Sequence, residues 1–360
     1  MKLNSHNEWD TLKEVIIGMP NARANLIFKK QLPKKVIEQA KKLAHEAYPK
    51  YMINDLTEDI NGLCDILKDY GVKIYRPKIK DVHNFFSTPY FNASTEHVFN
   101  PRDIFLIIGN TIIETPSYEK HRYFEAQAYY NILYKYFSQG CKWISAPKPM
   151  LRDGEKVTKK NKKECLKEKE IMFEAATVVR MGKSLLYLLS PSGNMLGAKW
   201  LQSILGKKYK IHITDKIYNG KHIDSTVICL NKKQVLLNAQ RVNKNNCPII
   251  FNKWDKIWLN KISPYPKEII DFHKKIRLKT YNKLQKLGIN SNLNNIHSEW
   301  VGINILSIDP ETVIVEKNQK YLIKKLEKRG LNCIPTQLRY SYFMGGLHCC
   351  SLDTVRKNTY

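Results

Sequence analysis

The sequence lacks the features of membrane and secreted proteins. No apolar run approaches the roughly 18 residues that a membrane-spanning helix needs. The opening stretch MKLNSHNEWDTLKEVIIG has no apolar core followed by small residues, as a secretory signal would have. We therefore expect a cytoplasmic protein with no membrane partner.

Cysteine pairs with metal-binding spacing and nucleotide-binding glycine motifs are also missing. The eight cysteines include no CxxC pair, and they are too sparse in 360 residues for a disulfide framework. We interpret them as reduced thiols and expect no metal site. Neither GxGxxG nor GxxxxGK[ST] occurs, so no nucleotide motif is present and no cofactor is expected.

Negative charge is scarce, since 60 Lys and Arg face 33 Asp and Glu, for a formal charge of +27. Such a balance attracts nucleic acid and anionic surfaces. However, lysines spread along the whole chain, and there is no arginine cluster, zinc-finger spacing or RNP-like aromatic motif. We interpret the charge as a solvated lysine coat and expect no nucleic-acid partner. The alternative, a basic protein that binds nucleic acid or anionic lipid, predicts affinity that falls steeply with salt.

What the sequence does contain is a repeated unit. Four segments show apolar residues at helical spacing, then a glycine suited to a left-handed cap, then a short β-rich run. They are residues 60–77, 129–147, 198–215 and 321–338, with Gly71, Gly140, Gly206 and Gly330 as the caps.

Pairs of β-rich runs joined by a tight turn accompany these segments. They are DIFLIIGNTIIETP, TVVRMGKSLLYLLS, STVICLNKKQVLLNAQ and NILSIDPETVIVE; the third precedes a longer, divergent segment running to about Asn295. EVIIG near the N-terminus has no partner strand, and CCSLDTVR near the other end could supply it. Five strand–turn–strand–helix–strand units bury most surface when packed around a common axis. The pattern therefore favours a closed α/β repeat fold, a single domain over residues 1–360.

Polar residues precede the first strand of each unit. They are Asp103, Glu174, His222 with Asp224, Ser298 and Cys349. Because equivalent positions of a closed ring converge on its axis, we expect these side chains to meet in one central pocket. Each alone has a plainer reading, such as a buried thiol or a turn aspartate, but their shared position makes coincidence a poor explanation. Cys350 should lie beside Cys349 on a strand, with its side chain on the opposite face.

A cysteine beside a histidine is the usual pair for an activated thiol. Carboxylates next to such a pair are unfavourable for a protease, because they raise the thiol pKa and repel an oxyanion. They suit a flat cation such as a guanidinium group, whose N–H donors carboxylates accept in pairs.

On these motifs the sequence resembles the amidinotransferases, including arginine:glycine and inosamine-phosphate amidinotransferases. The likeness runs from HNEWDTLKEVIIG through PRDIFLIIGNTIIETP, KW-S-APKP, FEAA and HID to GGLHCCSLDTVRK, nearly the whole chain. The resemblance implies a five-bladed α/β propeller of pseudo-fivefold ββαβ modules, here closed by the two termini. It also implies a homodimer.

The resemblance implies a role for each matching residue. Cys349 corresponds to the nucleophile, His222 to the general acid/base, and Asp103 and Asp224 to guanidinium-binding carboxylates. Glu174 corresponds to the first acid of the family's FDAAD motif, and Thr177 replaces the second. The remaining matches are Arg241 and Ser298, at positions that bind the amino-acid carboxylate, and Asn219 on the acceptor side. Lys221 departs from the family pattern, because it replaces an apolar residue beside the histidine.

The implied activity moves the amidino group of L-arginine to an acceptor amine through an amidino-cysteine, releasing ornithine. The acceptor is glycine or another amine. The alternative is a guanidine-group hydrolase of the same superfamily, similar to arginine deiminases and dihydrolases, in which water replaces the acceptor. Glutamate at position 174 is common in those hydrolases.

Overall fold

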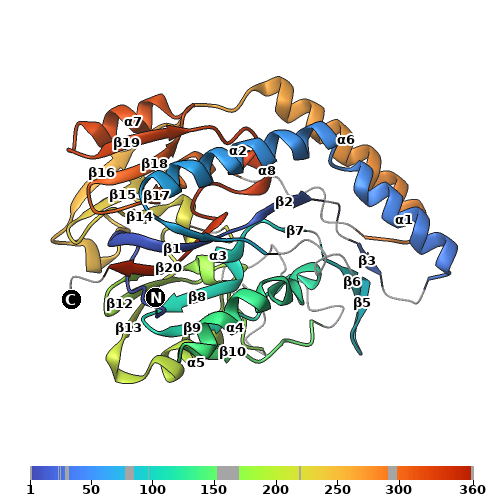
Figure 1. The fold of residues 1–360 in the computed structure, drawn as a ribbon, viewed down its shortest axis with the longest axis horizontal. Helices are drawn as coiled ribbons and strands as arrows, with labels where there is room; N and C mark the ends of the chain where they lie inside the picture. Colours follow the sequence, from blue (N-terminus) through green and yellow to red (C-terminus); the bar gives the residue numbers. More distant parts are fainter. Residues whose placement is uncertain are drawn as a thin grey trace.

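The computed structural model describes residues 2–22, 24, 26–28, 32–77, 85–95, 97–151, 170–218, 220–290 and 298–357. Within these ranges the chain forms a mixed α/β fold of small sheets with helices at the periphery (Figure 1). None of the described helices combines the length and the apolar character that crossing a bilayer requires.

Four of the described sheets follow one plan, in which two strands form an antiparallel hairpin and a third strand pairs parallel with the second. The first of these sheets consists of β8 (Phe105–Ile108), β9 (Thr111–Glu114) and β10 (Lys142–Ser145). The second consists of β11 (Val178–Met181), β12 (Ser184–Leu188) and β13 (Lys210–Thr214). The next two are β14 (Val227–Cys229), β15 (Gln234–Asn238), β16 (Asp255–Leu259) and β17 (Leu306–Ser307), β18 (Thr312–Glu316), β19 (Asn332–Thr336).

A fifth sheet of the same plan joins the two ends of the sequence. Strand β20 (Ser351–Lys357) pairs antiparallel with β1 (Thr11–Ile17), and β4 (Lys73–Tyr75) pairs parallel with β1. The predicted contribution of CCSLDTVR to the N-terminal strand is therefore confirmed. The hydroxyl of Ser5 reinforces this closure by donating a 2.7 Å hydrogen bond to Asp353, 348 residues away in sequence.

Helices connect the second and third strands of most units. These are α2 (Lys50–Asp69) before β4, α4 (Tyr130–Ser138), α5 (Met195–Leu205) and α7 (Lys320–Glu327), and Figure 1 shows them outside the strands. In α2 the buried residues include Leu56, Ile60, Leu63 and Leu67, so one apolar stripe faces the sheet. Each helix is followed by a glycine with φ between 61° and 86°, as the spacing of the four cap glycines predicts.

The unit of β14–β16 differs from the pattern. Between β15 and β16 the chain makes a 3₁₀ turn at Ile249–Phe251 instead of an α-helix. The intervening sequence AQRVNKNNCPIIFNKWD is rich in asparagine and contains a proline, a composition that disfavours a helix. The long helix α6 (Lys267–Lys286) follows β16 and packs against α1 (Lys34–Glu46).

An insertion between β1 and β8 builds two further small sheets. One pairs β2 (Met19–Ala22) with β7 (His97–Val98), and the other joins β3 (Ile27–Phe28), β6 (Asn92–Ser94) and β5 (Phe85–Ser87). The short helices α3 (Pro101–Ile104) and α8 (Ser341–Met344) themselves carry residues that line the cavity described below.

The apolar core lies between neighbouring sheets. Five clusters of buried residues each draw on two of the five sheets, and following them from sheet to sheet returns to the start. For example, Ile107 of β8 belongs to one cluster with Ile16 of β1 and Leu352 of β20, whereas Leu106 belongs to the next cluster with Leu185 of β12. The alternation of inward and outward side chains along β8 thus connects one sheet to both of its neighbours.

Candidate active site

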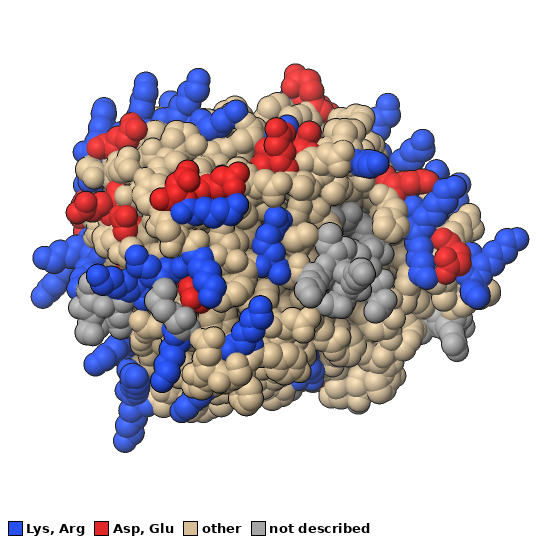
Figure 2. Space-filling view, in the orientation of Figure 1, with Lys and Arg blue, Asp and Glu red and all other residues tan. Residues whose placement is uncertain are grey.

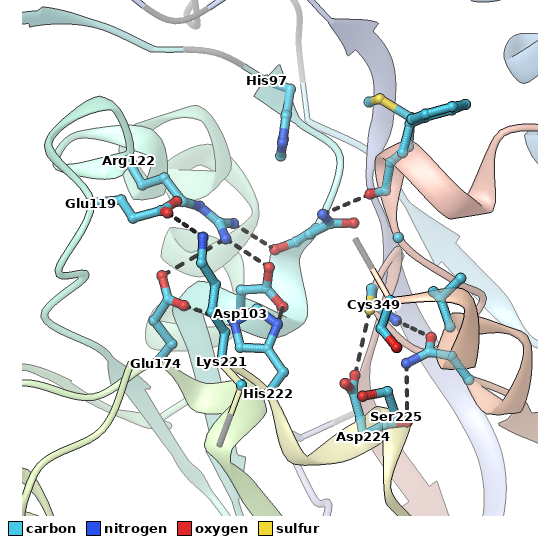
Figure 3. Close-up of a pocket in the computed structure, with 18 of the residues that line it drawn as sticks. His97, Asp103, Glu119, Arg122, Glu174, Lys221, His222, Asp224, Ser225 and Cys349 are labelled. Atoms are coloured by element: carbon cyan, nitrogen blue, oxygen red, sulfur yellow. Dashed lines mark hydrogen bonds and ion pairs between the residues drawn. The ribbon is translucent and has the colours of Figure 1, made fainter. Parts of the chain in front are cut away.

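The polar residues that precede the hairpins gather around one cavity of about 350 Å³ (Figure 3). Each stands in a short turn immediately before its first strand, in or next to α3, a 3₁₀ turn or the loop before β20. The lining includes Asp103, Glu174, His222, Asp224, Ser298 and Cys349. The repeated position of these residues in successive units therefore brings them together from distant parts of the sequence.

Two glycines shape the loop that carries Cys349. Gly345 has φ of 105°, a conformation that disfavours side chains, and a Cβ at Gly346 would lie 2.5 Å from the Cβ of Asn304. This close approach lets the Asn304 side chain accept a 3.0 Å hydrogen bond from the backbone N–H of Cys349. The glycine pair thus fixes the position of the cysteine.

Cys350 is not on a strand, contrary to the sequence-based prediction, because β20 begins only at Ser351. It lies with Cys349 in the preceding turn, fully buried, and its thiol points to the carbonyl oxygen of Leu347 at 3.4 Å. Cys350 does not line the cavity, and Cys349 does. The seven cysteines in the described ranges are all free thiols.

The thiol of Cys349 is buried next to a carboxylate. Its sulfur lies 3.5 Å from Oδ2 of Asp224, and the same oxygen lies 3.0 Å from Nδ1 of His348. Burial, with further contributions from Asp224 and Asp103, raises the pKa of Cys349 well above its usual value. Burial alone would raise the pKa of Asp224, but His348 and His222 outweigh it and lower that pKa to about 2. The free site therefore holds a neutral thiol beside an ionised carboxylate.

His222 faces two acids. Its Nε2 atom lies 2.7 Å from Oε2 of Glu174, and its Nδ1 atom lies 3.7 Å from Oδ1 of Asp103. Burial opposes protonation of the imidazole, but Asp103, Glu174 and Asp224 together raise its pKa to about 9. His222 is therefore a cation at neutral pH and can serve as a proton donor.

Arg122, which the sequence analysis did not single out, orients the acids around His222. Its guanidinium bonds Oδ2 of Asp103 at 2.6 Å and both carboxylate oxygens of Glu125, at 2.6 and 3.0 Å. The other Asp103 oxygen, Oδ1, is buried without a hydrogen-bond partner among the described residues. A carboxylate fixed in this way has one oxygen available for an N–H donor that enters the cavity.

Thr177, which replaces the second Asp of the FDAAD motif, forms a hydrogen bond within its own turn. The hydroxyl of Thr177 donates a 2.7 Å hydrogen bond to the backbone oxygen of Glu174 and closes the 3₁₀ turn. Glu174 also accepts a 3.0 Å hydrogen bond from Ser117. Although burial opposes ionisation of Glu174, His222 and Arg122 lower its pKa.

Lys221 also lines the cavity and pairs with Glu119 (Figure 3). Glu119 in turn contacts His121 at 3.2 Å. Burial opposes ionisation of Glu119, but Lys221 and His121 hold its pKa well below the usual range. The sequence showed Lys221 as a departure from the family pattern, whereas its partner Glu119 carried no recognisable signal.

Arg241 and Ser298 lie together at one side of the cavity. An Nη atom of Arg241 donates a 2.7 Å hydrogen bond to Oγ of Ser298, and the guanidinium stacks 3.7 Å from the ring centre of Tyr218. Ser298 and Tyr218 line the cavity, and Arg241 contacts both of them. Asn219 lies outside the described residues.

A buried ionic cluster underlies the site. Asp353 is fully buried and bonds Arg102, Arg180 and Arg356 at 2.5 to 2.8 Å. Glu8 bonds Arg180 at 2.8 Å and lies 3.2 Å from Nε2 of His348. His348 thus connects the cluster to Asp224 and so to the sulfur of Cys349.

The arrangement combines a thiol, a protonated imidazole and carboxylates around an enclosed space. Carboxylates that surround a cavity favour a cationic ligand, and the thiol beside them can attack an electrophilic carbon of that ligand. No group of three or more His, Cys, Asp or Glu side chains in the described ranges could hold a metal ion.

Comparisons with known proteins agree with this chemistry. No family model matches the chain. Inosamine-phosphate amidinotransferase 1 of Streptomyces griseus is 36% identical over 98% of this chain and 96% of its own length. L-arginine:L-lysine amidinotransferase of Pseudomonas savastanoi pv. phaseolicola is 30% identical over 98% of this chain and 94% of its own. The mitochondrial glycine amidinotransferase of Xenopus tropicalis is 29% identical over 99% of this chain and 83% of its own length.

Solved structures extend the likeness to three dimensions. The inosamine-phosphate amidinotransferase of Streptomyces griseus superposes with a TM-score of 0.83 at 34% identity, covering 99% of this chain and 97% of the other. An amidinotransferase of the saxitoxin biosynthetic pathway from Microseira wollei superposes with a TM-score of 0.78 at 36% identity, covering 99% of this chain and 98% of the other. The chain belongs to the amidinotransferase family.

Proposed function

We propose that this protein transfers the amidino group of L-arginine to an acceptor amine through a covalent intermediate on Cys349. The observation that carries the proposal is the meeting of Cys349, the His222–Glu174 pair and the carboxylates of Asp103 and Asp224 around one cavity. Asp103 offers an oxygen without a hydrogen-bond partner in the described part of the chain, and Asp224 is ionised beside the sulfur. Both suit the N–H edges of a guanidinium group.

In the first half-reaction, the bound guanidinium neutralises the carboxylates that oppose ionisation of Cys349. The thiol releases its proton to solvent, and the thiolate attacks the guanidinium carbon. A C–S bond forms, and the C–N bond to ornithine breaks with its electron pair on nitrogen. His222, held protonated by its acids, donates a proton to that nitrogen. Ornithine leaves, and the amidino group remains on sulfur.

In the second half-reaction an acceptor amine enters the same cavity. It gives a proton to the now neutral His222 and attacks the amidino carbon; the new C–N bond forms as the C–S bond breaks, which restores the thiolate. Glu174 orients the imidazole through the 2.7 Å contact to Nε2. Such a covalent relay predicts ping-pong kinetics.

The donor carboxylate is assigned to the Arg241–Ser298 pair, whose contact places a guanidinium and a hydroxyl at one side of the cavity. Asn219 remains part of the proposal as an acceptor-side residue. The acceptor itself is left open between glycine and other amines, since the relatives named above act on different ones.

The proposal includes the arrangement of the whole chain. The cyclic order in which apolar clusters connect the five sheets supports a five-bladed α/β propeller closed by β1 and β20, a single domain over residues 1–360. The proposal also includes a cytoplasmic location. It further includes a homodimer in solution, and sedimentation velocity would test that oligomeric state.

The deciding experiment incubates the protein with isotopically labelled L-arginine, with and without a panel of amines. We expect ornithine release stimulated by one class of amine, and a labelled adduct on Cys349 detected by mass spectrometry. Cys349→Ala should abolish the adduct, whereas Cys350→Ala, which changes the neighbouring thiol outside the cavity, should retain it. Citrulline and ammonia from arginine alone would instead identify a hydrolase.

A further inference from the structure

Arg277 of α6 is a buried cation that lines the cavity without a carboxylate partner in the described part of the chain. Arg277 is only 6% exposed, and its Nε atom has no hydrogen-bond partner among the described residues. The contact that the structure gives its guanidinium is with the ring of Tyr48, at 6.0 Å. Burial of an unpaired charge is costly, so a charge held at a cavity wall indicates a ligand of opposite sign.

The other permanent cations at the cavity are already matched. Arg122 bonds Asp103 and Glu125, and Lys221 pairs with Glu119. The acids around His222 and Cys349 are thereby set for the cationic end of a substrate. Arg277 supplies positive charge that no described acid balances.

Packing fixes the part of the cavity wall that Arg277 occupies. His273, one helical turn earlier on α6, stacks on Phe343 of α8 at 3.8 Å between ring centres. Phe343 and Met344 line the cavity just before the glycine pair that positions Cys349. The rigid stacking of α6 on α8 therefore holds Arg277 in the same enclosure as the reactive sulfur.

A second donor projects from β7. The Nδ1 atom of His97 accepts a 3.3 Å hydrogen bond from the backbone N–H of Phe99, so in the neutral ring the proton lies on Nε2. Figure 3 shows this ring projecting toward the cavity interior, apart from the carboxylates around His222. An N–H from His97 can thus contribute to the same ligand.

Helix α6, which carries Arg277, and its neighbour α1 are rich in lysine. Helix α6 has the sequence KEIIDFHKKIRLKTYNKLQK, and the adjacent α1 has KKVIEQAKKLAHE. Figure 2 shows Lys and Arg side chains crowded at the end of the molecule where Figure 1 places α1 and α6. Such a field attracts anionic solutes toward this end of the molecule.

From these contacts we infer that Arg277, assisted by His97, binds an oxyanion carried by the acceptor amine, a carboxylate or a phosphate, and thereby selects anionic acceptors. The inference rests on the proposed function. The donor does not need this site, because its guanidinium is assigned to Asp103 and Asp224 and its carboxylate to Arg241. The acceptor is the remaining substrate, and it must bind after ornithine has left.

The test separates the two half-reactions in the full-length enzyme. Arg277→Met removes the charge at similar length, Arg277→Lys retains it, and Lys275→Met removes an exposed charge from the same helix as a control. The amidino adduct is formed with L-arginine and followed by intact-protein mass spectrometry. The decay of the adduct is then measured after adding one of three amines. Ethanolamine carries no acidic group, glycine carries a carboxylate, and phosphoethanolamine carries a phosphate.

We expect Arg277→Met to form the adduct at the wild-type rate but to transfer it to its anionic acceptor about 10- to 100-fold more slowly, the effect of one lost charged hydrogen bond. Arg277→Lys should recover part of that loss, and Lys275→Met should behave as wild type. The acceptor whose rate falls identifies the oxyanion. Equal slowing of adduct formation, or of transfer to ethanolamine, would overturn the inference. Failure of the wild-type enzyme to form any adduct would instead refute the proposed function.

Discussion

The sulfur of Cys349 lies 3.5 Å from a carboxylate oxygen of Asp224, and this proximity opposes the formation of a thiolate in the empty site. The same carboxylate is well placed to hold a guanidinium group. In the proposed mechanism, Asp224 would keep Cys349 protonated until the substrate cation binds, and a reactive thiolate would form mainly in the complex. On that proposal, the sulfur would be modified less readily between turnovers.

Asp224→Asn should therefore change thiol reactivity and activity in opposite directions. Loss of the negative charge lowers the pKa of Cys349, so alkylation of the free enzyme at neutral pH should become faster. Adduct formation with arginine should fall about 10²-fold, since one charged contact to the substrate is lost. Iodoacetamide titration across pH and single-turnover mass spectrometry measure the two effects, with exposed Asp215→Asn as the control. A fall in both rates would contradict this role.

Glu174→Gln should move the basic limb of the pH profile for ornithine release. The pKa of His222 is about 9 with its acids in place, and protonated His222 is the form that the proposed first half-reaction needs. Because removing a carboxylate disfavours the imidazolium, the pKa should fall and activity should be lost at lower pH than in the wild type. Ornithine release measured from pH 6 to 10 tests this expectation, and exposed Glu327→Gln should leave the limb unmoved.

Arg241→Gln should discriminate between arginine and agmatine, which lacks the carboxylate. We expect kcat/KM for arginine to fall about 10- to 100-fold, with little change for agmatine, because the lost contact is to the carboxylate alone. Ser298→Ala should act in the same direction but more weakly. Equal losses for both donors would show that Arg241 serves only to support the loop through its 2.8 Å contacts to Ser225 and Thr226.

Asp353→Asn should destabilise the fold itself. Its carboxylate is fully buried among three arginines, so its removal leaves uncompensated positive charge in the interior, at a cost of about 3–5 kcal/mol. Asp255→Asn breaks an exposed pair with Arg329 and should cost less than about 1 kcal/mol. Urea denaturation followed by circular dichroism compares the two. A similar loss for both variants would show that burial does not govern these ion pairs.

The sequence predicted the repeat because its signals are local. Helical spacing, cap glycines and tight turns depend on neighbouring residues, and the hairpins appear where those signals stand. The pairing of β1 with β20 could be inferred because only one strand lacked a partner. The missing helix between β15 and β16 was not foreseen, because it reflects weak helix propensity in a divergent segment. The turn around Cys350 was not foreseen either, because β20 begins later than expected, at Ser351.

Prediction of the site was limited by long-range contacts. Residues at equivalent places in the units, such as Glu174 and His222, could be grouped from the pattern. Arg122, Glu119 and Arg277 lie outside those places, on a 3₁₀ turn, a loop and a helix that reach the cavity only after folding. Nothing in the local sequence around an arginine shows which carboxylates it will meet.

The hydrogen bond between Ser5 and Asp353 joins groups 348 residues apart, and the strand that follows Cys349 completes the N-terminal sheet. Loop-closure entropy must be overcome before such distant contacts stabilise the fold, so we expect this closure to be a late step of folding. We therefore expect Cys349 to reach its place only when this closure is made. In a refolding experiment, recovered catalysis would report the final docking step, whereas helix content would return earlier.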